Sequence, residues 1–395
     1  RRPARARISS ARPGSASSYR FVTNCQDGAM PDLSPRAIAW ATTMAGHPAE
    51  GVVRAHVEPG ARLELARPIL REQREAWEAE HLAAAASRAL GAGDRAREEE
   101  PDPERTCFER DRDRIVHSTA FRRLAGKTQV VVHPSDHQRT RLTHALEVAQ
   151  VATSIARGVG VNVTLAEAIA LGHDCGHGPG GHASEDAFDA FLPEGYDHGP
   201  WGADVVLTSL NLCRQTLDGI RNHSWSRPTP STIEGEIVSW ADRIAYCAHD
   251  LEDAIGAGIV RPGEVPDAVV AIAGGTRREQ LSTFVREVIA TATETGAIGM
   301  RATVAGALAE LRAFNYERIY TRPESLAQSD AVIAVLQALV SFYLENPARL
   351  PEPPADPGLL THAAVAYVGG MTDRFAFDTA VALLGWDPAR LPRPQ

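Results

Sequence analysis

Four side chains of types that commonly bind metal ions lie in three segments of the chain: His144, the adjacent pair His173 and Asp174, and Asp242. Two imidazoles and two carboxylates form a mixed nitrogen and oxygen ligand set. Such a set is typical of a site for Mn, Mg, Fe, Co, Ni or Zn and not of a structural zinc site, whose ligands are mainly thiolates. A second His-Asp pair at residues 249–250, among 14 His and 50 acidic residues, makes the dipeptide alone a weak signal. The four residues are candidate ligands of one divalent cation, and the alternative is four unrelated polar residues.

Residues 139–157 have the spacing of apolar residues that is typical of an amphipathic helix. His144 shares one face of this helix with Val148, Val151 and Ile155. A His on an apolar helix face is usually a satisfied core residue. Burial of several His and Asp side chains without a cation would be costly, however, because unpaired buried charge is unfavourable.

Two further helices are predicted from capping-box patterns, in which Thr164 precedes Glu167 and Ser231 precedes Glu234 by three residues. The first helix carries the adjacent His-Asp pair near its end, where Gly176 stops it. The second carries the remaining candidate carboxylate beside its apolar stripe. The candidate ligands are therefore expected on three helices.

Six stretches, in the same order, resemble the HD-domain deoxynucleoside triphosphate triphosphohydrolases, the dGTPase-like proteins. The resemblance covers roughly residues 70–380 and is carried by "RTCFERDRDRIVHSTAFRRLAGKTQVVV", "RTRLTHALEVAQ", "ALGHDCGHGPGGHASE", "LNLCRQTLDGIRNH", "EGEIVSWADRIAYCAHDLEDAI" and "YVGGMTDRFAFD". It implies an all-α HD-domain phosphohydrolase fold and hydrolysis of a dNTP to a deoxynucleoside and tripolyphosphate.

The resemblance also implies roles for individual residues. The metal ligands would be His144, His173, Asp174 and Asp242, and the catalytic pair would be His182 and Glu185. The residues that contact sugar or phosphate would be Gln129, Arg141, Arg243, Tyr246 and Asp250. The chain departs from the family at Pro179-Gly180-Gly181, where Pro-Phe-Gly is usual, and at Ser184, where Gly is usual. Loss of the Phe is expected to loosen this loop or to widen the pocket.

Composition sets further limits. The net charge of −9 argues against general coating of duplex DNA, although residues 105–141 carry nine Lys or Arg against four acidic residues. The sequence contains no run of 18 apolar residues, so it predicts no membrane span. Five scattered Cys without a CxxC pair are typical of a reducing, cytoplasmic compartment. His177, His198 and His223 are as consistent with surface positions as with a pocket.

The organisation predicted from sequence has two parts. Residues 1–70 form an Arg- and Ser-rich extension that is predicted to be disordered or non-native, and residues 71–395 form the catalytic domain with a C-terminal helical part. Strand-like stretches are few, and "TQVVVH" (residues 128–133) is the best candidate.

Two other functions stay open at this point. One is an HD-domain phosphohydrolase that acts on another nucleotide, such as a monophosphate or an alarmone. The other is a non-catalytic sensor that binds a nucleotide or a single strand. The expected partners are the dNTP substrate, further copies of the chain in a homo-oligomer and single-stranded nucleic acid, with no membrane.

Overall fold

The computed structural model describes residues 34–58, 60, 67–130 and 138–392. The chain divides at Pro68 into two units. In the first unit, helix α1 (Pro35–Thr43) precedes an antiparallel hairpin of strands β1 (His47–Ala49) and β2 (Val52–Arg54). The extension predicted to be disordered or non-native covers residues 1–70, of which residues 1–33, 59 and 61–66 lie outside the described residues.

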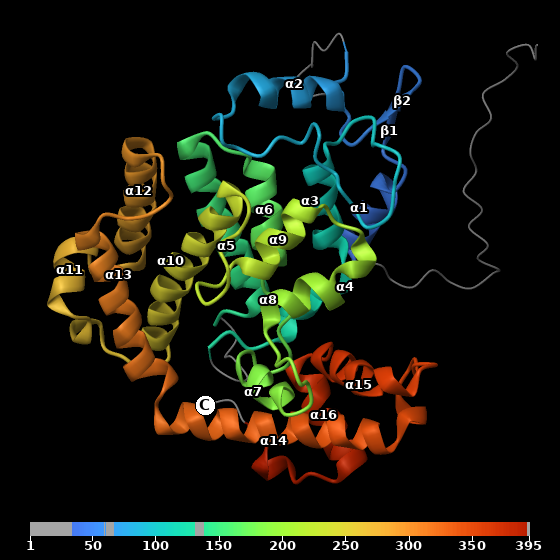
Figure 1. Ribbon diagram of the computed structural model, residues 1–395. Helices are drawn as coiled ribbons and strands as arrows, with labels where there is room; N and C mark the ends of the chain where they lie inside the picture. Colours follow the sequence, from blue (N-terminus) through green and yellow to red (C-terminus); the bar gives the residue numbers. More distant parts are fainter. Residues whose placement is uncertain (1–33, 59, 61–66, 131–137, 393–395) are drawn as a thin grey trace, which may run out of the picture. The chain divides into compact units, whose positions relative to one another are not determined.

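The second unit consists of helices and their connections throughout its described part, as Figure 1 shows, which confirms the predicted all-α fold. Its helices are α2 (Arg71–His81), α3 (Cys107–His117), α4 (Thr119–Arg123), α5 (Arg141–Val159), α6 (Val163–Gly172), α7 (Ala183–Asp189), α8 (His198–Trp201), α9 (Arg214–Asn222), α10 (Ile233–Gly256), α11 (Asp267–Ala273), α12 (Arg277–Thr295), α13 (Ala302–Asn315), α14 (Pro323–Glu345), α15 (Leu360–Gly369) and α16 (Asp373–Leu384).

The prediction of a strand over "TQVVVH" is wrong for residues 128–130, the part of this stretch that the structure describes. Thr128 forms only an isolated antiparallel bridge with Thr140. The reason is that the backbone N–H of Thr128 donates instead to the side chain of Asp373, at 2.9 Å. Residues 131–133 lie outside the described residues.

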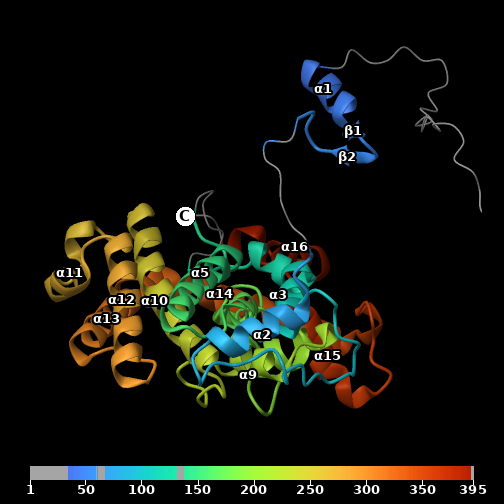
Figure 2. The ribbon, with the colours of Figure 1, turned by 90° about the horizontal axis from the view of Figure 1, so that it is seen from above.

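Helices α5, α6 and α10 lie at the centre of the larger hydrophobic core. The apolar face predicted for α5 is confirmed, because Val148, Val151 and Ile155 are all buried in this core. Helices α11, α12 and α13 lie together beside α10 in both views of the ribbon (Figures 1 and 2). The packing of α5, α6 and α10 against one another places the three segments that carry the candidate ligands side by side.

The predicted helix starts are displaced by one or two residues. Helix α6 is capped by Asn162, whose side chain accepts a hydrogen bond from the N–H of Leu165 at 3.1 Å, and not by Thr164. Helix α10 is capped by Thr232 and not by Ser231. In both cases a neighbouring polar side chain reaches the free N–H groups of the first turn.

The predicted end of α6 is also wrong. The helix ends at Gly172 and not at Gly176. Residues 173–177 form turns instead, with hydrogen bonds from Cys175 N to Gly172 O at 3.0 Å and from His177 N to Asp174 O at 3.1 Å. The His-Asp pair therefore lies in a turn after the helix.

A second hydrophobic core lies between α7, α14, α15 and α16. Helix α14 is the long helix that runs below α7 in Figure 1. By length and composition alone it could cross a membrane. Its side chains at Val332, Val335, Leu336, Leu339 and Val340 are fully buried in this core.

Glu234 of α10 lies at a buried junction of three segments. Its carboxylate accepts hydrogen bonds from Ser87 N at 3.0 Å, Ser87 Oγ at 2.8 Å and Asn162 N at 2.9 Å. Glu78 of α2 accepts from the Asn162 side-chain amide at 3.0 Å. The two carboxylates therefore connect α2, the start of α6 and the start of α10, and Glu234 is not the capping-box residue that its spacing predicted.

Replacement of Glu234 by Gln should lower the free energy of unfolding by about 2 kcal/mol, because a neutral amide oxygen accepts more weakly than the carboxylate from the buried donors of Ser87 and Asn162. Urea denaturation followed by circular dichroism measures this change. The matched control Glu236→Gln, on the same helix and half-buried, should change the stability by less than about 0.5 kcal/mol. Equal stability of the two variants would contradict the role given to Glu234.

Candidate metal centre and its pocket

His144, His173 and Asp242 come together where three helices meet. His144 lies in the first turn of α5, His173 follows α6 directly, and Asp242 lies on α10. The Nε2 atoms of His144 and His173 lie 3.1 and 3.7 Å from the same Asp242 Oδ1. One ligand atom from each residue lies within 4.8 Å of the other two. These three predicted ligands form a group that could bind a cation.

Asp174, the fourth predicted ligand, lies next to this group. Its Oδ2 accepts a hydrogen bond from the Arg141 guanidinium at 2.8 Å. Its Oδ1 lies 3.4 Å from His173 Nε2 and 3.3 Å from His177 Nε2. Asp174 and Arg141 are both buried, so one carboxylate oxygen is fixed by Arg141 and the other faces the imidazoles.

His173 has the environment of a metal ligand. Its Nδ1–H donates to the carbonyl oxygen of Ala170 at 2.6 Å, which assigns the ring proton to that nitrogen. Its Nε2 is buried and has no hydrogen-bond partner among the described residues. A buried ring nitrogen without a partner is unfavourable, and a cation between it and the carboxylates would satisfy it. The residues present therefore fit a divalent metal ion.

The charges of this group stabilise one another. Burial alone would raise the pKa of Asp242, but the hydrogen bond from His144 and the neighbouring imidazoles together lower it. Burial would likewise raise the pKa of Asp174, but Arg141 holds it well below its usual range. Burial would lower the pKa of His144, but its bond to Asp242 raises it. Both carboxylates are therefore ionised and present negative oxygens to a cation.

A second group of titratable side chains comprises His177, His182, Glu185 and His198. Glu185 connects two of them, because its Oε2 lies 3.5 Å from His182 Nδ1 and its Oε1 lies 2.5 Å from His198 Nδ1. The rings of His177 and His198 stack with centroids 3.7 Å apart. The His182 side chain is 73% exposed and that of Glu185 is 25% exposed. His182 is therefore the member of this group that solvent and a ligand can reach.

The three His whose positions the sequence left open are all buried here: His177, His198 and His223. His198 Nε2 lies 3.0 Å from His223 Nε2, and the rings of His223 and His173 are 5.0 Å apart. Burial lowers the pKa of His223 to about 3. A row of imidazoles thus connects the first group to Glu185. The signals in the sequence were the density of His between residues 173 and 198 and the place of His223 at the end of "LNLCRQTLDGIRNH".

Both groups face one pocket of about 420 Å³. Nine of the eleven predicted site residues line it: Gln129, Arg141, His144, Asp174, His182, Asp242, Arg243, Tyr246 and Asp250. The other two, His173 and Glu185, contact lining residues from behind, at the distances given above.

One wall of the pocket is formed by Tyr246 and Asp250 of α10 with two residues that sequence reasoning missed. The Tyr246 hydroxyl accepts a hydrogen bond from Arg312 Nε at 2.8 Å, and the Tyr320 hydroxyl donates to Asp250 Oδ2 at 2.6 Å. Burial raises the pKa of Asp250 to about 7. Arg312 and Tyr320 come from segments more than 60 residues later in the chain, and no motif marks them.

Arg243 lies over the ring of Trp225, with its guanidinium carbon 3.4 Å from the ring centroid. The Trp225 indole N–H donates to Ser239 O at 3.0 Å, which fixes the ring. The Nε of Arg243 is buried and has no hydrogen-bond partner among the described residues. Stacking of this kind orients a guanidinium and leaves its edge free for an anion.

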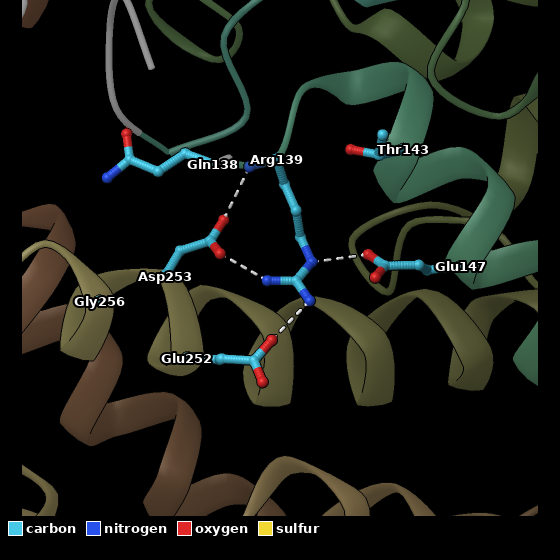
Figure 3. Close-up of a pocket in the computed structure, with 7 residues that line it drawn as sticks. All are labelled: Gln138, Arg139, Thr143, Glu147, Glu252, Asp253 and Gly256. Atoms are coloured by element: carbon cyan, nitrogen blue, oxygen red, sulfur yellow. Dashed lines mark hydrogen bonds and ion pairs between the residues drawn. The ribbon is translucent and has the colours of Figure 1, made fainter. Parts of the chain in front are cut away.

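Most of the basic residues between 105 and 141 have structural partners instead of facing the pocket. Figure 3 shows Arg139, which lines a separate pocket, between Glu147 of α5 and Glu252 and Asp253 of α10, at 2.8, 2.7 and 2.5 Å. Arg141 is the one described Arg or Lys of this segment that lines the pocket. The local positive charge predicted from sequence is therefore largely neutralised by neighbouring carboxylates.

The chain is similar to known proteins over most of its length. Residues 141–247 match the HD domain, and residues 298–381 match the phosphohydrolase-associated domain. A deoxyguanosinetriphosphate triphosphohydrolase-like protein of Caldanaerobacter subterraneus subsp. tengcongensis is 39% identical over 335 residues, which are 82% of this chain and 97% of that protein. A protein of the same name from Desulfatibacillum aliphaticivorans is 37% identical over 78% of this chain and 95% of its own length.

A solved phosphohydrolase structure from Bacteroides thetaiotaomicron is 17% identical over 69% of this chain and 68% of that one, with a TM-score of 0.44. A TM-score this low does not assign the family. The assignment comes from the two relatives above, because the similarity extends over nearly the whole length of those proteins. The chain therefore belongs to the HD-domain family of deoxyguanosinetriphosphate triphosphohydrolase-like proteins.

Proposed function

We propose that this chain uses a divalent metal ion to hydrolyse deoxynucleoside triphosphates to deoxynucleosides and tripolyphosphate. Its family makes it a nucleotide phosphohydrolase. We call His144, His173, Asp174 and Asp242 the cation group. One observation supports the narrower proposal: members of the cation group, His182 and His198 beside Glu185, and the wall of Tyr246 and Asp250 all line the same pocket. The names of the relatives agree with it.

The residues of the first group supply the phosphate end of the site. His144, His173, Asp174 and Asp242 would bind the metal ion, which acidifies water and draws charge from phosphoryl oxygens when bound. Arg141, fixed by Asp174 at 2.8 Å, presents a cation to the phosphates. Together these residues neutralise the charge that develops during hydrolysis.

The second group supplies proton transfer. His182 is open to the pocket and has the Glu185 carboxylate 3.5 Å behind its Nδ1. Burial alone would raise the pKa of Glu185, but its contacts with His182 and His198 lower it. An ionised Glu185 can orient the His182 ring, so that its Nε2 can take or give a proton at the reacting phosphate.

Tyr246 and Asp250 of this wall, together with Gln129, would recognise the sugar. The Tyr246 ring is fixed at its hydroxyl by Arg312. A fixed aromatic ring against the deoxyribose leaves no space for a 2′-hydroxyl, and in this way the site would exclude ribonucleotides.

The same proposal includes a homo-oligomer, a cytoplasmic location and single-stranded nucleic acid as a further partner. The second candidate function, hydrolysis of another nucleotide, has the same metal group in its favour. An assay of four dNTPs and four NTPs with Mn, Mg, Fe, Co, Ni and Zn, with products separated by ion exchange, distinguishes the candidates. Tripolyphosphate from dNTPs supports the proposal; release of single phosphate or the absence of turnover contradicts it.

Replacement of Asp242 by Asn should lower the metal content after dialysis at least about 10-fold, because Asp242 Oδ1 is the oxygen shared by His144 and His173. Hydrolysis should be lost with the metal. Elemental analysis and the turnover assay measure the two effects, and Glu236→Gln on the same helix serves as the control. Full metal content in the Asp242 variant would show that the cation binds elsewhere.

Replacement of His182 by Ala should leave the metal content unchanged and lower kcat about 100-fold, the usual contribution of general acid–base catalysis. The control is His117→Ala, an exposed His at the end of α3, which should retain wild-type kcat. If the His182 variant also loses metal, His182 is a ligand and its assigned role is wrong.

Replacement of Tyr246 by Ala should raise NTP hydrolysis relative to dNTP hydrolysis about 10-fold, because loss of the ring opens space beside the sugar. Tyr246→Phe keeps the ring and loses only the hydroxyl that contacts Arg312, so it should keep the wild-type ratio. Initial rates with paired dNTPs and NTPs measure both ratios. An unchanged ratio in the Ala variant would place discrimination of the sugar at another residue.

A further inference from the structure

Two buried side chains of opposite charge connect the C-terminal helices to the pocket: Lys127 and Asp373. The Lys127 ammonium donates to the carbonyl oxygens of His177 and of Gly369, the latter at 3.0 Å. Gly369 is the last residue of α15, and His177 lies in the turn that follows the metal-binding pair. Lys127 is therefore bound to the turn on one side and to the C-terminal helices on the other.

Asp373 connects the same segments through hydrogen bonds of the opposite sense. Its Oδ2 accepts from Thr128 N at 2.9 Å and from Thr128 Oγ1 at 2.5 Å, and its Oδ1 accepts from Gly180 N at 2.8 Å. Asp373 is buried, and the capping of α16 is performed by Thr372. The hydrogen bonds of its carboxylate go to Thr128 and Gly180 of the pocket, so this carboxylate is not explained by the needs of its own helix.

The segment that Asp373 binds near Gly180 has an unusual backbone. Gly180 and Gly181 have φ angles of +73° and +66°, in the left-handed region that favours glycine. A Cβ at Gly180 would lie 2.4 Å from Val332, and one at Gly181 would lie 2.6 Å from the Arg141 guanidinium. The space expected from loss of the Phe is therefore closed by Val332 on this side.

This double-glycine turn leads directly into His182, and Thr128 leads directly into Gln129. Two glycines in succession give the backbone more freedom than any other pair. A fixed acceptor is needed to select one conformation, and Asp373 Oδ1 is the acceptor for Gly180 N. The same carboxylate fixes Thr128, so one side chain sets the positions of two residues of the site that lie 53 positions apart in the chain.

We propose that Asp373 is a positioning residue, whose carboxylate aligns His182 and Gln129 by binding the Gly180 turn and Thr128 together. The inference rests on the proposed function, because it concerns the alignment of the group that transfers the proton. Asp373 touches neither the cation group nor the space where the substrate would lie. It should therefore act on the rate and on the order of the turn without changing the affinity for metal.

The test uses Asp373→Asn in the full chain. The amide keeps the size of the side chain but offers only one acceptor oxygen, so either Thr128 or Gly180 loses its partner. We expect kcat to fall about 10- to 100-fold, the effect of a misplaced reacting group, with a smaller change in KM and an unchanged metal content. Hydrogen exchange should become faster at the amides of Thr128 and Gly180.

The matched control is Asp378→Asn, an exposed Asp on the same helix, which should leave kcat and hydrogen exchange unchanged. Asp373→Asn with wild-type kcat and wild-type exchange overturns the inference and leaves the proposed function standing. If the wild-type protein releases no tripolyphosphate from any dNTP, the proposed function fails, and exchange at Gly180 alone then decides the inference.

A second variant decides the outcome if Asp373→Asn does not fold or loses metal. Thr128→Val removes only the hydroxyl donor and keeps the backbone bond. It should lower kcat about 3-fold, the effect of one lost hydrogen bond of roughly 0.7 kcal/mol, and should speed exchange at Gly180. Wild-type values for both measurements in this variant overturn the inference.

Discussion

The burial of charge within a helical core is the constraint on which this site depends. Asp174 is buried against the buried guanidinium of Arg141, and Asp242 lies between two imidazoles. A carboxylate that leaves water is strongly unfavourable unless a partner replaces its hydration. Arg141 on α5 and Asp174 after α6 can therefore be buried only together, and the half-buried Asp242 connects α10 to His144 and His173. The candidate metal ligands form the polar centre of the core itself.

Sequence periodicity predicted the helices of the site better than their ends. The face of α5 that carries His144 follows from the spacing of Val148, Val151 and Ile155, because burial of this stripe is a local property of the pattern. The cap of α6 did not follow from its pattern. Asn162 and Thr164 are both good capping residues, and a bond from Leu165 N to the Asn162 side chain decides between them only in the folded chain.

The two His-Asp pairs show why the site was only partly predictable. His173 and Asp174 lie in a turn, and their side chains meet at 3.4 Å. In the pair on α10, adjacent residues point about 100° apart, so Asp250 lines the pocket while His249 lies 3.2 Å from Glu147 on another side of the helix. The same dipeptide therefore has two outcomes, and the secondary structure around it determines which one occurs. Burial of His198 and His223 depends on contacts between distant segments, which no local pattern contains.

The pocket is assembled from two parts of the chain with different tasks. The cation group comes wholly from residues within the HD-domain match, 141–247, whereas Arg312, Tyr316, Tyr320 and Gln328 come from the phosphohydrolase-associated match, 298–381. The first part is constrained by buried charge, since a change at any ligand leaves another charge unpaired. The second part contributes Arg312 and Tyr320 to the wall that Tyr246 and Asp250 form, and neither belongs to the cation group. Substitutions at Arg312 or Tyr320 can therefore change this wall and leave the cation group intact, whereas Asp373, in the same match, contacts the pocket segments at Thr128 and Gly180.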